Sequence, residues 1–213
     1  MTSMTTMSTS MTTRWISSRR WRPAVSATGA RGRSLVALAT DGKSSEYDVP
    51  YDVVNPNGRE PYELRVYGAY YVAATPYENR ERGLAKLMEY IEGENAERAM
   101  YPPTQPLTTR YFPDGGKTME LALLGRRARE SIAAPKEDSD VRVMASGGEL
   151  VAAVAFEGNA TPEVAEYYRS NLVAALKSNG MAVTNEDEFR INTFGPLYSL
   201  KTRRNELLMQ VKV

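Results

Sequence analysis

The residues best suited to hold a ligand gather between positions 82 and 101. Arg82 and Lys86 are four residues apart, a spacing that places both side chains on one face of a helix, and such a pair of cations suits an anion. An apolar stripe at the helical period runs along the same segment, formed by Leu84, Leu87, Met88 and Ile91. Together they offer apolar surface beside cationic partners. The simpler interpretation is that the stripe is core and that both cations are solvated.

The sequence contains no His and no Cys. It therefore lacks the commonest general base, the commonest metal ligand and any thiol nucleophile. A Ser-His-Asp triad, a disulfide, a thiolate zinc site and an iron–sulfur cluster are all excluded. Carboxylates, Lys and Tyr can still perform acid–base chemistry. The composition thus lowers the expectation of an enzyme without excluding one.

The first forty residues have a composition of their own. They contain six Arg, no Asp or Glu, and many Ser and Thr. A Ser-rich, Arg-rich and acid-poor segment is typical of an organelle transit peptide, and the excess of hydroxyl residues over Arg favours a chloroplast over a mitochondrion. The alternative is an ordinary basic tail. We predict a transit peptide or disordered segment over residues 1–44 and one folded domain over residues 45–213.

Charge and hydropathy limit the classes of partner. The net charge of the whole chain is +1, and without residues 1–40 it is about −5, because that segment holds six Arg and no acid. An acidic domain does not attract nucleic acid. No run approaches the roughly 18–20 apolar residues of a membrane-spanning helix. We therefore expect no nucleic-acid partner and no transmembrane segment. Peripheral association with a membrane complex stays open. We also expect the protein to be a monomer.

Hydrophobic periodicity predicts the order strand–helix–strand–strand, twice. The first helix is expected from its cap at Asn79 to about Gly93, and the second from Thr161 and Pro162 to about Asn179. The expected strands cover residues 62–75, 107–112, 118–124, 141–145, 149–157, 190–194 and 206–213. Residues 125–140 are expected to form an exposed loop.

The pattern also predicts faces and a fold class. In the first strand, alternation places Leu64, Val66, Tyr70 and Val72 on one face and Glu63 and Arg65 on the other. Two helices and many antiparallel strands predict an α+β domain, in which a curved sheet or distorted barrel carries both helices.

Five segments in chain order resemble motifs of the SOUL haem-binding-protein family. They are Tyr62–Tyr67 (YELRVY), Leu87–Asn95 (LMEYIEGEN), Pro135–Val141 (PKEDSDV), Val154–Thr161 (VAFEGNAT) and Arg203–Glu206 (RRNE). The resemblance covers essentially the whole predicted domain. It implies a distorted antiparallel β-barrel flanked by two α-helices and built from two halves of like element order.

The resemblance also implies a ligand. Members of the family bind haem or related tetrapyrroles non-covalently in a shallow apolar groove, and some are proposed to use an axial His, which this chain lacks. The cofactor-binding residues so implied are Arg82, Leu84, Lys86, Leu87, Met88, Ile91, Met100 and Tyr101. Iron ligation would fall to Met88, Met100 or Tyr101, and packing is the alternative role of each. We expect no catalytic residue and no dedicated metal site.

Three functions are compatible with these patterns. The first is a tetrapyrrole carrier or buffer in a plastid, where plant and algal members of the family occur. The second is a non-pigmented structural or scaffold protein of a plastid membrane complex or lipid globule, with no bound cofactor. The third is a small-molecule sensor or hydrolase, by analogy with bacterial effector-binding domains of similar fold. A buried Glu facing an open groove would favour the third.

Overall fold

The computed structural model describes residues 48–55, 60–124, 131–195 and 203–212, so the predicted transit peptide lies outside the described residues. Its helices are α1 (Arg80–Ile91) and α2 (Pro162–Ser178). Its strands are β1 (Tyr51–Val53), β2 (Glu63–Tyr67), β3 (Tyr70–Pro76), β4 (Leu107–Tyr111), β5 (Lys117–Ala122), β6 (Arg142–Ser146), β7 (Glu149–Glu157), β8 (Phe189–Phe194) and β9 (Arg204–Gln210).

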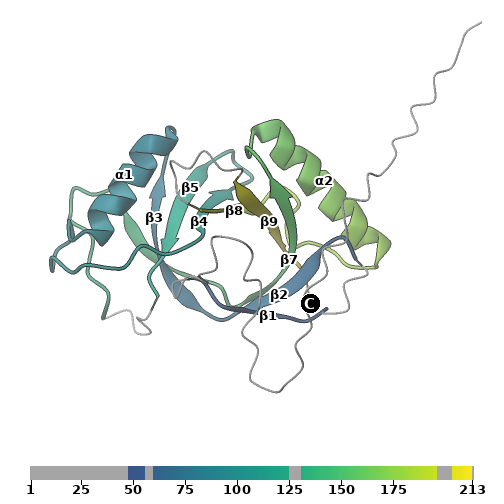
Figure 1. The fold of residues 1–213 in the computed structure, drawn as a ribbon, viewed down its shortest axis with the longest axis horizontal. Helices are drawn as coiled ribbons and strands as arrows, with labels where there is room; N and C mark the ends of the chain where they lie inside the picture. The colour runs from purple at the N-terminus through teal and green to yellow at the C-terminus, as the bar shows by residue number, and fades with distance from the viewer. Residues whose placement is uncertain (1–47, 56–59, 125–130, 196–202, 213) are drawn as a thin grey trace, which may run out of the picture.

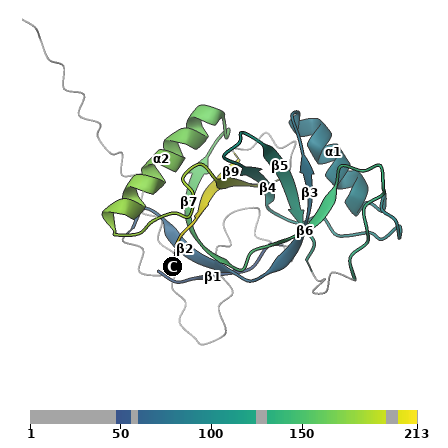
Figure 2. The ribbon, with the colours of Figure 1, turned by 180° about the vertical axis from the view of Figure 1, so that it is seen from behind.

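In the described part of the chain, the strands form one antiparallel sheet in the order β1-β2-β7-β9-β8-β4-β5-β3-β6. The sheet curls on itself, and the two helices lie on its outside, α1 beside β3 and α2 beside β7 (Figures 1 and 2). This arrangement confirms the predicted α+β fold, a distorted barrel flanked by two helices. Neither described helix is both long and apolar enough to cross a membrane.

The barrel closes because β2 and β3 behave as one bent strand. Tyr67 pairs with Glu149, and three residues later Tyr70 pairs with Ser146, so the register continues unbroken from the β2–β7 pair to the β3–β6 pair. On its other side, β7 pairs with β9, and β3 pairs with β5. These pairs join the two ends of the sheet and close the barrel. The strand predicted over residues 62–75 is therefore interrupted by a bend at Gly68.

Each strand of the barrel has an outer and an inner face. On the outside, α2 packs on β7, β8 and β9 through one apolar cluster, and α1 packs on β3 and β5 through a second. A smaller apolar cluster, which includes Val151, Ala153 and Leu208, lies on the inner face. Because both faces are partly buried, alternation along a strand does not show which face is polar.

The faces predicted for the first strand are confirmed within β2, where Leu64 and Val66 lie outside and Glu63 and Arg65 inside, but the polar face is the buried one. Beyond the bend at Gly68 the alternation shifts, and Tyr70 and Val72 lie on the inner face.

Arg65 is only 3 % exposed, whereas Val66 is 39 % exposed. Arg65 points to the interior of the barrel, where the carboxylate of Glu206 compensates its charge. Val66 lies on the outer face, and it is left in solvent there. A buried charge is tolerated only with such a partner, and the partner lies 141 residues away along the chain.

Other differences are local. The segment predicted as an exposed loop contains Ile132 and Ala133, which are buried against α1, whereas residues 125–130 lie outside the described residues. Strand β1 was not predicted, because three edge residues carry too short a pattern. Both predicted helix caps are confirmed: Asn79 accepts backbone hydrogen bonds from α1, and Thr161 accepts one from α2.

Candidate functional site

Half of the predicted apolar stripe on α1 faces the core. Leu87 is fully buried, and Ile91 and Tyr101 are 3 % and 7 % exposed. All three belong to the cluster that holds α1 on β3 and β5. Leu84 and Met88 are half-buried at the edge of this cluster and keep part of their surface for a ligand. The stripe therefore anchors the helix, and its margin provides the accessible apolar surface.

The structure distinguishes among the three candidate iron ligands. The Tyr101 ring stacks on Tyr90 with 5.8 Å between centroids, and its hydroxyl accepts a hydrogen bond of 2.7 Å from the Ala133 N–H. Met88 is half-buried. Met100 is 74 % exposed, in the loop that follows α1. Met100 is therefore the most accessible of these three side chains.

The two predicted cations stand on the side of α1 away from Leu84 and Met88, because successive residues of an α-helix turn by about 100°. Arg82 is exposed. Lys86 forms an ion pair with Asp140, and its side chain stays 42 % exposed. An exposed ion pair of this kind contributes little to stability and exchanges readily with solvent. Both cations are therefore accessible from solvent.

A further cation was not found from the sequence. Arg80 begins α1 beside Tyr77 and Tyr111, and the Tyr111 ring stacks on Phe189 with 4.5 Å between centroids. Burial lowers the pKa of Arg80, and the nearby charge of Arg203 lowers it further. Arg80 and Arg203 are thus within electrostatic range of each other. Arg80 and Arg203 are far apart in the chain, so no local sequence pattern indicated that their charges interact.

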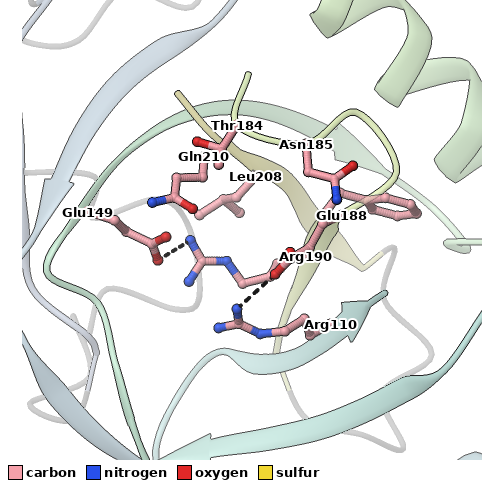
Figure 3. Close-up of a pocket in the computed structure, with 9 residues that line it drawn as sticks. Arg110, Glu149, Thr184, Asn185, Glu188, Arg190, Leu208 and Gln210 are labelled. Carbon is pink, nitrogen blue, oxygen red and sulfur yellow. Dashed lines mark hydrogen bonds and ion pairs between the residues drawn. The ribbon is translucent and has the colours of Figure 1, made fainter. Parts of the chain in front are cut away.

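A pocket opens on the inner face of the barrel, away from α1 (Figure 3). It is an open hollow of about 300 Å³, a volume that includes the solvent at its mouth, and Leu208 forms part of its lining. Its polar lining comes from β4, β7, β8, β9 and the segment before β8, and includes Arg110, Glu149, Thr184, Glu188, Arg190 and Gln210. Burial alone would lower the pKa of Arg110, but Glu120 and other nearby carboxylates raise it. All these side chains are polar or charged, so this pocket does not suit an apolar macrocycle.

A second charged cluster lies on the inner face, between β2 and β9. Arg65 donates two hydrogen bonds to Glu206, of 2.7 and 3.1 Å, and its guanidinium lies 4.2 Å from the centre of the Tyr51 ring. Glu63 and Arg204 extend the cluster at its two ends. Glu206 is 1 % exposed. Every charge in this cluster has a partner, so the cluster holds the barrel together.

A sequence model of the SOUL heme-binding protein family matches residues 47–210. The chain belongs to this family. SOUL proteins bind haem or related tetrapyrroles and are a binding family, so a small-molecule ligand is the expected partner of this SOUL domain. None of the curated proteins matches the chain. The residues that hold the ligand here stay a prediction.

Solved structures similar to this SOUL domain include two from Listeria innocua. One is an uncharacterized conserved protein with a TM-score of 0.53 and 8 % sequence identity, covering 78 % of this chain and 100 % of that chain. Another is a hydrolase with a TM-score of 0.51 and 9 % identity, covering 71 % of this chain and 91 % of that chain. At such low identity, these likenesses show the fold alone.

Proposed function

We propose that the chain is a non-enzymatic tetrapyrrole carrier or buffer of a plastid, which binds the macrocycle without an axial His. The observation that carries this proposal is that α1 keeps both apolar side chains and cations accessible, in a SOUL domain whose whole sequence contains no His. The accessible apolar side chains are Leu84, Met88 and Met100, and the accessible cations of α1 are Arg80, Arg82 and Lys86. A porphyrin needs apolar contact for its ring and cations for its propionates.

The buried carboxylates support a binding role rather than hydrolysis. Glu206 and Glu120 are 1 % and 3 % exposed, as a catalytic carboxylate would be. Glu206 accepts hydrogen bonds from Arg65 and Arg204, and Glu120 accepts them from Arg110 and Thr118. A general base needs a carboxylate that is free to take a proton near neutral pH. Arg65 and Arg204 stabilise the charged form of Glu206 and oppose that role, and Arg110 and Thr118 hold Oε1 of Glu120.

Titration of the protein with haemin and with metal-free protoporphyrin tests the binding mode. Without an axial His, we expect dissociation constants that agree within about tenfold. Met100→Ala should raise both dissociation constants about threefold to tenfold, because the pigment ring then loses its contact with the exposed thioether. The matched control is Met144→Ala, which removes a 44 % exposed Met on β6 and should leave binding unchanged.

Three outcomes would contradict this binding mode. Equal effects of the two Met variants would place the site elsewhere than beside α1. Haemin that binds over about a hundredfold more tightly than protoporphyrin, with the advantage lost in Met100→Ala, would make Met100 an axial ligand. A protein that binds neither pigment would favour the alternative, a non-pigmented scaffold protein of a plastid membrane complex or lipid globule.

The plastid location rests on the composition of residues 1–40, which hold six Arg and no acidic residue. We expect the full chain, tagged at its C-terminus with a fluorescent protein, to enter chloroplasts. The same chain without residues 1–44 should stay in the cytosol. Mitochondrial import of the full chain, or chloroplast import of the shortened chain, would contradict this part of the proposal.

A further inference from the structure

The pocket of Figure 3 is built around two arginines that face each other across a strand pair. Arg110 on β4 and Arg190 on β8 are direct partners in the register. Like charges placed opposite each other on neighbouring strands destabilise a sheet unless other groups compensate them. Glu120 and Glu188 bind Arg110, and Glu149 binds Arg190. The pocket therefore contains charges of both signs at close range.

The hydrogen-bond donors of these two arginines are only partly used within the described residues. Arg190 is 7 % exposed, and its Nη2 lies 2.6 Å from Oε1 of Glu149, the one ion pair it makes there. Arg110 donates firmly through Nε to Glu120 at 3.0 Å. Its Nη1 and Nη2 reach Glu188 and Ser146 at 3.4 and 3.5 Å, close to the limit of a hydrogen bond. Because a guanidinium carries five N–H donors, both groups keep donors for a ligand.

The hydrogen-bond acceptors that line the pocket are also only partly bonded within the described residues. Within the part of the chain that the structure describes, the Glu188 carboxylate makes one polar contact, at 3.4 Å from Arg110, and its side chain is 40 % exposed. Gln210 and Thr184 are exposed and lie at the same pocket, opposite Arg110 in Figure 3. A ligand cation could therefore bind Glu188 without displacing a strong bond.

We propose that this pocket binds a small zwitterion of the α-amino acid type. The carboxylate of the ligand lies between Arg190 and the terminal nitrogens of Arg110, and its ammonium group binds Glu188. A simple anion would meet the repulsion of the three carboxylates, and a simple cation that of the two guanidinium groups. A zwitterion matches both sets of charges at once. This site is separate from the tetrapyrrole surface on α1 and does not depend on the proposed function.

An NMR titration of the full-length protein with glycine tests the proposal, with acetate and methylammonium as probes that carry one of its two charges. At equal ionic strength, we expect saturable shifts of the Arg190 and Gln210 backbone amides with glycine, and a dissociation constant of about 1 mM. Each singly charged probe should bind at least about tenfold more weakly.

Glu188→Gln provides the matched variant, because the side chain is partly exposed and its loss should not prevent folding. We expect it to weaken glycine binding about tenfold and to leave pigment binding unchanged. The control is Glu186→Gln in the same loop, where the carboxylate pairs with Lys177 on α2 and does not line the pocket. This variant should bind glycine like the original chain.

Two results would overturn the proposal. Acetate that binds as tightly as glycine, with no effect of Glu188→Gln, would show an anion site. An absence of saturable shifts up to about 0.1 M for all three probes would show a pocket that holds water alone.

Discussion

Replacing Glu206 by Gln should lower the free energy of unfolding by about 3–5 kcal/mol, as measured by urea denaturation at neutral pH. Arg65 is 3 % exposed, and Glu206 neutralises it through two hydrogen bonds inside the barrel. Gln keeps the shape of the side chain but removes its charge. The guanidinium would then stay buried with Glu63 as its remaining carboxylate partner.

Two further variants separate the loss of the buried pair from general damage. Glu63→Gln removes a carboxylate that also binds Arg65 but is 30 % exposed, so it should cost only about 1 kcal/mol. The double replacement Arg65→Met with Glu206→Leu removes both charges together and should be less destabilising than Glu206→Gln alone. Equal costs for Glu206→Gln and Glu63→Gln would contradict the central role of the buried pair.

The same pair makes stability depend on pH. Burial alone would raise the pKa of Glu206, but the charges and hydrogen bonds of Arg65 and Arg204 outweigh burial and hold it below the ordinary value of 4.5. The unfolded state therefore takes up this proton first as the pH falls. The contribution of Glu206 is complete above about pH 4.5 and is lost as the pH falls through the folded-state pKa. Glu206→Gln should flatten the acid limb of the stability profile.

Replacing Gly147 by Ala should lower the free energy of unfolding by at least about 3 kcal/mol or prevent folding. Gly147 lies at the bend where β6 passes into β7, with φ +76°. A Cβ atom there would lie 2.1 Å from the carbonyl oxygen of Gly68 and 2.9 Å from the Tyr70 ring. The oxygen belongs to the backbone of the opposite bend, so relief would require both strands to move apart.

The neighbouring glycines supply the controls for this prediction. Gly148 has φ +70°, but a Cβ atom there meets nothing within 4 Å. Gly148→Ala should therefore cost only about 1–2 kcal/mol, for the left-handed backbone alone. Gly68→Ala has neither a positive φ nor a close neighbour and should cost less still. If Gly147→Ala and Gly148→Ala have the same cost by thermal or urea unfolding, the close approach of the two bends does not limit the fold.

Part of the ligand surface could be read from the sequence, because a helix face depends on residues three or four apart. The stripe of α1 and its accessible cations were predicted in this way, as was the cap at Asn79. The pattern did not show which part of the stripe is accessible. Leu87 is fully buried and Met100 is 74 % exposed, and both facts depend on how α1 and the following loop pack on the sheet.

The sequence by itself determined the family, the order of the elements and many of their limits. The strand expected over residues 149–157 has the same bounds as β7, and both helices begin after the expected caps. These features depend on neighbours in the chain. The tertiary structure alone decided that Arg65 is interior, that Arg110 meets Arg190, and that two bends touch at Gly147. Each of these contacts joins segments that are distant in sequence, and a barrel buries parts of both strand faces, so local alternation could not reveal them.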